Sequence, residues 1–190
     1  MSSGSWAGYS SRFKRFITIF LCIIFCIVMT VGGTLTPLSH TESNNINKQI
    51  DQLRTTDENT SLWQGALSIF ENNFAIDLVM FIPIAGWVFG SIVLYNSGLA
   101  FNALSTDPTI SNPNHFSGTI IFLLNFISPH QTLEFIAYGT AFAASIWLFW
   151  RIVRGGAIRE LKRTGMFILI CAVLLLVAAF IEEYLLLTLG

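Results

Sequence analysis

The sequence predicts an all-α fold, a polytopic bundle of transmembrane helices with about five crossings, one of them broken or re-entrant. Hydrophobic residues make up 53% of the 190-residue chain and charged residues only 11%, whereas soluble domains average about 25% charged residues. The apolar residues also fall in runs long enough to cross a bilayer, which takes about 20 residues per helix. We therefore expect a single helical domain in a cell membrane.

Several classes of function are disfavoured by the same composition. The charged residues are few and lie mostly at the ends of apolar segments, so the chain has no basic face for nucleic acid. Cys22, Cys26 and Cys171 all lie inside apolar runs, where neither a disulfide framework nor a metal site is expected. The nucleotide-binding G-x-x-x-x-G-K-[ST] pattern and the hydrolase patterns H-E-x-x-H and G-x-S-x-G do not occur. We expect no cofactor and no enzymatic activity.

The first apolar run covers residues 16–35 and follows a tail, residues 1–15, that carries three basic side chains. A charged start before an apolar core also fits a signal peptide, but the uninterrupted core of residues 16–31 slightly exceeds the usual signal length. We interpret the run as a retained transmembrane helix. The positive-inside rule then places the N-terminal tail in the cytoplasm.

Residues 36–71 are largely polar and lie on the extracytoplasmic side if the first helix spans the membrane. Ile46, Ile50 and Leu53 recur at helical spacing, which predicts a short amphipathic helix on the outer surface. A second short helix is expected to end near Glu71, where two asparagines follow.

The membrane core is predicted to occupy residues 72–190. Asn72 and Asn73 are predicted to form a helix end or turn at its start, because asparagine favours caps and turns. The stretch 74–95 is long enough to cross toward the cytoplasm, and Pro83 within it predicts a kink.

Small residues follow along this stretch. Gly86 and Gly90 form a G-x-x-x-G spacing that lets another helix approach closely. The sequence from Asn96 to Gly98 predicts a break in the helix, and residues 105–115 are predicted to form a cytoplasmic loop.

The second half of the core begins with a short apolar segment, residues 117–128, that either spans or re-enters the membrane. Pro129 ends it, because the residue before a proline is pushed out of helical geometry. Full-length helices are predicted over 131–150 and 165–187. Between them the segment 151–164 holds half of all lysines and arginines, the mark of a cytoplasmic loop.

Three ionisable residues are expected to meet inside the membrane. Glu134 lies 17 residues before Arg151, and Glu182 lies 19 residues after Arg163. At 1.5 Å per residue both are roughly 25–28 Å from the basic segment, near the outer edge of the hydrocarbon. His130 is one turn from Glu134 on the same helix face. Such residues usually face the bundle interior and suggest function.

Three interpretations of this polar cluster stay open. It is a structural cluster, a path for protons or substrate, or a metal site for which His130 and Glu134 are weak candidates. Adjacent helix residues diverge by about 100°, so Glu183 is expected to point to headgroup water, away from Glu182. Asp77 is expected to extend to the outer interface.

A stripe of small residues shares the helix of Glu134. Ala137, Ala141 and Ser145 are spaced four apart, which together with Gly86 and Gly90 predicts close helix packing. The same spacing could also serve a partner, so a homo-oligomer is possible.

Three fragments, taken together, resemble the stage II sporulation protein M family. They are "IFENNFAIDLVMFIPIAGWVFGSIVLYNSGLAFNAL", "SPHQTLEFIAYGTAFAASIWLF" and "LLLVAAFIEEYLL", and they run in the family's order from about Leu62 to the C-terminus. One departure is Gln131, where the family has glycine, which puts a tight turn there in doubt. The positions that match the family's motifs are Asn72, Asn73, Asn96, Gly98, Pro129, His130, Glu134 and Glu182.

The resemblance implies a polytopic membrane scaffold whose enzymatic work is done by partners, without implying a sporulation role. The predicted function is therefore a non-enzymatic scaffold or accessory subunit that positions other membrane or extracytoplasmic proteins among the membrane lipids. The main alternative is a small permease or channel component that moves protons, ions or a small solute along a path lined by His and Glu. An intramembrane hydrolase would need a nucleophile or metal centre that the sequence does not offer.

Overall fold

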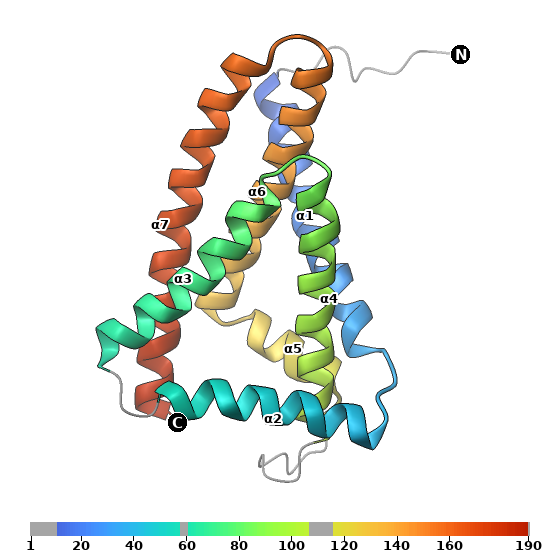
Figure 1. The fold of residues 1–190 in the computed structure, drawn as a ribbon, viewed down its shortest axis with the longest axis vertical. Helices are drawn as coiled ribbons and strands as arrows, with labels where there is room; N and C mark the ends of the chain where they lie inside the picture. The colour runs from blue at the N-terminus through green and yellow to red at the C-terminus, as the bar shows by residue number, and fades with distance from the viewer. Residues whose placement is uncertain (1–10, 58–60, 107–115, 190) are drawn as a thin grey trace.

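The computed structural model describes residues 11–57, 61–106 and 116–189, and this part of the chain consists of helices joined by turns, without strands (Figure 1). The helices in chain order are α1 (Ser11–Thr34), α2 (His40–Asp57), α3 (Leu62–Met80), α4 (Ala85–Ser105), α5 (Gly118–Phe126), α6 (Pro129–Val153) and α7 (Ala157–Leu189). The predicted fold class is confirmed.

Four of the described helices, α1, α4, α6 and α7, are long and apolar enough to cross a membrane, near the five crossings expected from the sequence. Large apolar side chains on their outer faces, such as Phe16, Val173 and Leu187, are more than half exposed. A soluble protein rarely exposes so many large apolar groups, whereas lipid accommodates them.

The helices define two ends of the molecule. The start of α1 and the turn between α6 and α7 lie together at one end, whereas α2 lies across the other (Figure 1). We call the first the basic end, because residues 12–15 and 151–163 carry eight of the ten lysines and arginines. We call the second the α2 end.

The stretch 74–95 is not the single kinked helix that the sequence predicts. It is divided between α3 and α4, which run in opposite directions and meet at a turn below the level of the α6–α7 turn (Figure 1). Pro83 lies in the turn, where its missing N–H and its ring oppose helix continuation. Next to it, Ile84 has φ 65° and ψ −61°, a γ-turn conformation with positive φ that is unusual for a β-branched residue. The chain therefore reverses where a bend was expected.

Two other predicted helix ends are also wrong. The helix expected to end near Glu71 continues to Met80, and the helix expected to break at Asn96 continues to Ser105. Tertiary packing overrides the local preference in the second case. A Cβ at Gly98 would lie 2.0 Å from the backbone oxygen of Thr30, so glycine is needed there for α4 to pack on α1.

The α2 helix is fixed to the hairpin by polar contacts. Ser43 and Thr106 share a hydrogen bond of 2.7 Å between their hydroxyls, and Asn47 donates to the backbone oxygen of Ala103 at 3.3 Å. The sequence predicted a cytoplasmic loop over residues 105–115, on the side opposite α2. Thr106 instead contacts α2, so the predicted side is wrong for this residue. Residues 107–115 lie outside the described part of the chain.

The short segment before Pro129 is helical only in α5, whose nine residues cover about 14 Å. It lies toward the α2 end and contributes Phe122 to the core (Figure 1). Pro129 is at the start of α6, where its missing N–H costs nothing. Most of the segment 151–164, expected as a loop, is helical, because α6 ends at Val153 and α7 begins at Ala157.

The core lies where the hairpin tip meets α1 and α6. Phe142 from α6 packs edge-on against Phe25 and next to Trp87, with ring centroids 5.7 and 4.7 Å away. Gly90 leaves room for this ring, since a Cβ there would lie 2.5 Å from the Phe142 ring. Met80 completes the contact and is fully buried. The packed tip separates the polar cavity described below from the basic end.

Candidate functional site: a polar cavity at the open side of the α3–α4 hairpin

A cavity of about 280 Å³ lies between α1, α3, α4 and α6. Its apolar wall includes Leu94 and Phe135, and its polar groups come from different helices. These polar groups belong to Thr30, Asn72, Asn73, Ser97, Gln131, Glu134 and Tyr138. A mostly apolar pocket with a few polar groups that converge is the usual form of a small-molecule site.

Glu134 is the central charged group of the cavity. It is buried, and one carboxylate oxygen accepts a hydrogen bond of 2.7 Å from the Asn73 side-chain amide. The other oxygen lies 3.5 Å from the Gln131 amide nitrogen. Glu182 of α7 is near enough to interact with Glu134 electrostatically. The structure thus joins Asn73 of α3 to Glu134 of α6, with Glu182 of α7 nearby.

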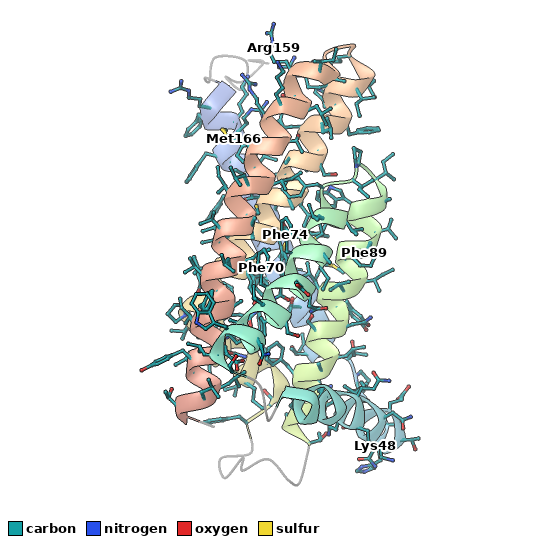
Figure 2. The ribbon with its side chains drawn as sticks, turned by 60° about the vertical axis from the view of Figure 1, so that its left-hand side comes forward. Lys48, Phe70, Phe74, Phe89, Arg159 and Met166 are labelled. Atoms are coloured by element: carbon teal, nitrogen blue, oxygen red, sulfur yellow. The ribbon has the colours of Figure 1, made fainter. Side chains whose placement is uncertain are left out.

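The hydrogen bond between Asn73 and Glu134 was not apparent from the sequence, because 61 residues separate the two. Asn72 is exposed at the cavity wall, with its amide 3.5 Å from the Asn73 oxygen. The α3–α4 reversal brings this polar face of α3 against α6. Phe70 and Phe74 stack on the same helix at 5.3 Å, and Figure 2 shows them midway along the molecule.

His130 is buried, and its hydrogen bond goes to Ser128 and not to Glu134, which it was expected to meet. Its Nε2 lies 3.4 Å from the Ser128 hydroxyl, and its Nδ1 has no partner among the described residues. No group of three or more His, Cys, Asp or Glu side chains in the described residues is arranged to hold a metal ion, including one with His130 and Glu134.

Two acidic residues do not point where the sequence predicts. Glu183 does not extend to headgroup water. It is buried against α3, where a Cβ on Gly65 would lie 2.2 Å from its carboxylate. Asp77 does not reach the interface either. It is fully buried, and neither of its oxygens has a hydrogen-bond partner in the described part of the chain.

The small residues of α6 lie inside the molecule. Ala137 and Ala141 are fully buried, and the Cys171 thiol of α7 contacts the backbone oxygen of Ala137 at 3.6 Å. The Ser145 hydroxyl donates to the backbone oxygen of Ile82 in the hairpin turn at 3.2 Å. On the hairpin itself, a Cβ on Gly86 would lie 2.5 Å from the oxygen of Met80, so Gly86 lets the turn close.

The two family-motif positions on α4, Asn96 and Gly98, differ in exposure. Asn96 is exposed and does not line the cavity, whereas its neighbour Ser97 does. Gly98 is buried, and Gly33 of α1 faces it so closely that a Cβ on either would lie 2.8 Å from the Cα of the other.

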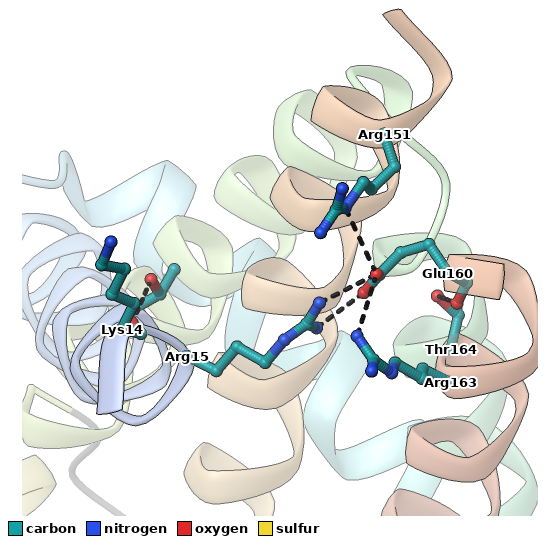
Figure 3. Close-up of polar contacts among 7 residues, drawn as sticks. Lys14, Arg15, Arg151, Glu160, Arg163 and Thr164 are labelled. Carbon is teal, nitrogen blue, oxygen red and sulfur yellow. Dashed lines mark hydrogen bonds and ion pairs between the residues drawn. The ribbon is translucent and has the colours of Figure 1, made fainter. Parts of the chain in front are cut away.

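A second polar centre at the basic end was missed in the sequence. The Glu160 side chain is only 3% exposed and receives two hydrogen bonds from Arg15, at 2.6 and 2.8 Å (Figure 3). Arg163 and Arg151 approach the same carboxylate at 3.7 and 3.9 Å. Arg15 also lies 4.7 Å from the centre of the Trp147 ring. The signal that could have revealed this centre is that Glu160 is the one acidic residue in a strongly basic segment.

With the geometry described, the chain can be placed among known proteins. The family model of stage II sporulation protein M matches residues 16–185. This chain belongs to the stage II sporulation protein M family. Searches of curated proteins and of solved structures found no match.

Membership in the stage II sporulation protein M family and the apolar helices together make this a membrane protein. The match covers α1 as well as the helices that carried the resemblance. In this member of the family, Asn73 and Glu134 form one hydrogen-bonded pair, while Pro129 begins the helix that presents Glu134.

Proposed function

We propose that this protein is a non-enzymatic scaffold or accessory subunit that positions other membrane or extracytoplasmic proteins in a complex, with its N-terminus in the cytoplasm. The orientation follows from the basic end, because basic residues near transmembrane helices favour the cytoplasmic side. The α2 end then faces outward. Neither nucleic acid nor a cofactor is part of the proposal, and a homo-oligomer is compatible with it.

The observation that carries this proposal is the fixed attachment of α2 across the outer end. Its inner face holds Ser43 and Asn47, which bond to the end of α4, while Asn45 and Gln49 on the other side are exposed. The helix begins with a capping box in which the Ser39 backbone N–H donates to the Glu42 carboxylate at 2.9 Å and the Glu42 backbone N–H donates to the Ser39 hydroxyl at 3.3 Å. A polar helix held firmly at the surface is suited to presenting a constant face to a partner.

The interior supports the same function. Asn73 and Gln131 already hold Glu134, and the packed rings around Phe142 close the cavity toward the basic end. A continuous polar path through the described helices is therefore not formed in this conformation.

Photo-crosslinking in native membranes tests the proposal. A crosslinking amino acid placed at Asn45 or Gln49 should capture distinct extracytoplasmic or membrane proteins, and gentle detergent purification should retain them in stoichiometric amounts. The matched control is the same amino acid at Val177, which is exposed on the apolar face of α7. If the purified protein is a lone monodisperse species and α2 captures no more protein than the control, the proposal is wrong.

The cavity favours one alternative, a small permease or channel component. A polar cavity with a buried carboxylate at Glu134 is a reasonable binding site for a proton, an ion or a small solute. Reconstitution in liposomes that contain a pH- or ion-sensitive dye would detect such transport. Under this alternative Glu134→Gln abolishes the signal, while under the scaffold proposal the wild-type protein gives none.

A further inference from the structure

Positive charge at the basic end greatly exceeds what its acidic partner can neutralise. The segments 12–15 and 151–163 hold eight basic residues and one acidic residue, Glu160, which leaves a net charge of +7. The Glu160 carboxylate is buried beneath Arg15 and is reached by two more guanidinium groups (Figure 3). An anion from outside the chain would relieve the remaining repulsion.

A groove at this end brings part of the charge to a lipid-facing surface. It has a volume of about 350 Å³ between the starts of α1 and α7, and its lining consists of Arg12, Arg15, Arg163, Met166 and Phe167. The lining therefore combines three basic side chains with two apolar ones.

The three guanidinium groups in the groove differ in how many of their hydrogen-bond donors are already engaged with Glu160. Arg15 gives two short hydrogen bonds to Glu160, and its side chain is 14% exposed. Arg163 is 48% exposed and reaches Glu160 only at 3.7 Å, which leaves most of its donors available. Arg12 is exposed, and no salt bridge to it is formed by the described residues. Arg12 and Arg163 are thus placed to bind an added anion.

The apolar surroundings indicate what kind of anion fits. Met166 is 55% exposed beside the groove, and Phe16 and Leu169 are 68% and 67% exposed one turn further into the apolar part of their helices. Figure 2 shows Arg159 at the tip of the basic end and Met166 further along α7. A ligand with a phosphate group next to acyl chains would contact both kinds of surface.

We propose that the groove between α1 and α7 binds the phosphate headgroup of an anionic phospholipid, with Arg12 and Arg163 as ligands of the phosphate and Met166 against the first part of an acyl chain. Arginine pairs with phosphate in a planar, bidentate geometry. A zwitterionic lipid carries a compensating cation and would leave the excess charge in place. Binding is therefore selective for lipids with net negative charge.

The test uses the full-length protein in phosphatidylcholine nanodiscs with spin-labelled phosphatidylglycerol or spin-labelled phosphatidylcholine as probe. Electron paramagnetic resonance measures the fraction of each probe that the protein immobilises. The wild-type protein should prefer phosphatidylglycerol. The double variant Arg12→Gln/Arg163→Gln should lose about 25-fold of that preference, since each basic residue near an anionic surface contributes about fivefold.

The matched control is Arg159→Gln/Lys162→Gln, which removes two charges from exposed positions at the same end but outside the groove. It should retain most of the preference, and Arg12→Lys/Arg163→Lys should retain more than the glutamine variant. Equal losses in the groove variant and the control would show a diffuse basic surface and overturn the proposal. So would equal immobilisation of the two probes by wild-type protein.

Two further arms separate the proposal from misfolding and from free phosphate. Met166→Glu changes an exposed residue and adds a carboxylate to the groove, so it should reduce the preference while circular dichroism shows intact helices. An unchanged preference in this variant would contradict the proposed position of the lipid. Excess inorganic phosphate should not displace the labelled lipid, because it lacks acyl chains; full displacement would assign the groove to a soluble anion.

Discussion

Replacement of Glu160, the one acidic residue of the basic end, by glutamine should weaken this end of the bundle. The variant keeps the shape of the side chain and removes the charge that three arginines share. Arg15, only 14% exposed, would then be left without its counter-charge beside Arg163 and Arg151. The start of α1 would lose its connection to the start of α7, which is 145 residues away in the sequence.

The magnitude follows from the geometry. Breaking a fully buried pair costs about 3–5 kcal/mol, and an exposed pair contributes about 0–1 kcal/mol. Arg15 and Glu160 form two short bonds and are mostly buried, whereas the two longer contacts involve half-exposed arginines. We expect Glu160→Gln to lower the free energy of unfolding by about 2–4 kcal/mol, nearly all through the Arg15 pair.

Unfolding by sodium dodecyl sulfate in mixed micelles, followed by far-ultraviolet circular dichroism, measures this change. A double-mutant cycle with Arg15→Met isolates the pair, and Glu42→Gln on α2 is an exposed control. A loss below about 1 kcal/mol, or additive effects of the two substitutions, would refute the buried, bidentate pairing.

Three other predictions concern the hairpin and the cavity. Ile84→Gly should raise the free energy of unfolding by about 0.5–1 kcal/mol in the same assay, because glycine adopts φ 65° without strain. Asn73→Ala should lower it by about 1–3 kcal/mol, because Glu134 loses its amide donor while it stays buried. Asp77→Asn should lower it by less than about 1 kcal/mol, because an unpaired buried carboxylate gives no hydrogen bond for the amide to lose.

The first two of these predictions have a control in the chain. Ile82→Gly changes an exposed residue of the same turn that lacks a positive φ, so it should not stabilise the protein. Asn72→Ala removes an exposed amide next to Asn73 and should cost little. A stabilising effect of Ile82→Gly equal to that of Ile84→Gly, an equal loss at the two asparagines, or a loss above about 2 kcal/mol for Asp77→Asn would contradict the respective argument.

The long helices could be predicted from the sequence because their signals are local. The apolar run, the preceding proline and the basic residues at its end together define α6 within a few residues. The short length of α5 was likewise visible in the segment before Pro129. These features depend on neighbouring residues alone.

The hairpin could not be predicted because local chemistry did not decide between a kink and a reversal. Pro83 permits both, and the positive φ of Ile84 runs against the preference of a β-branched residue. The contacts that hold the reversal come from elsewhere, such as the Ser145 hydrogen bond to Ile82.

The candidate site, too, was predictable only where neighbouring residues decide it. The sequence identified Asn73 and Glu134 separately but gave no sign that 61 residues of chain return to bring them together. It placed Asp77 by its distance from a helix end, which says nothing about the direction of the side chain. Glu160 was overlooked because its arginine partner lies at the other end of the sequence.

The V-shaped path of α3 and α4 has a consequence for biogenesis. The chain leaves α1 and enters α6 at the same end, so everything between Thr36 and Ser128 makes no net passage across the bilayer (Figure 1). The start of α1 and the end of α7 lie at opposite ends of the molecule, so this path would cross the bilayer an odd number of times (Figure 1). During membrane insertion, the hairpin would therefore enter the bilayer and return to the same side as one unit. Topology reporters fused at Leu38 and Ser105 should report the same compartment.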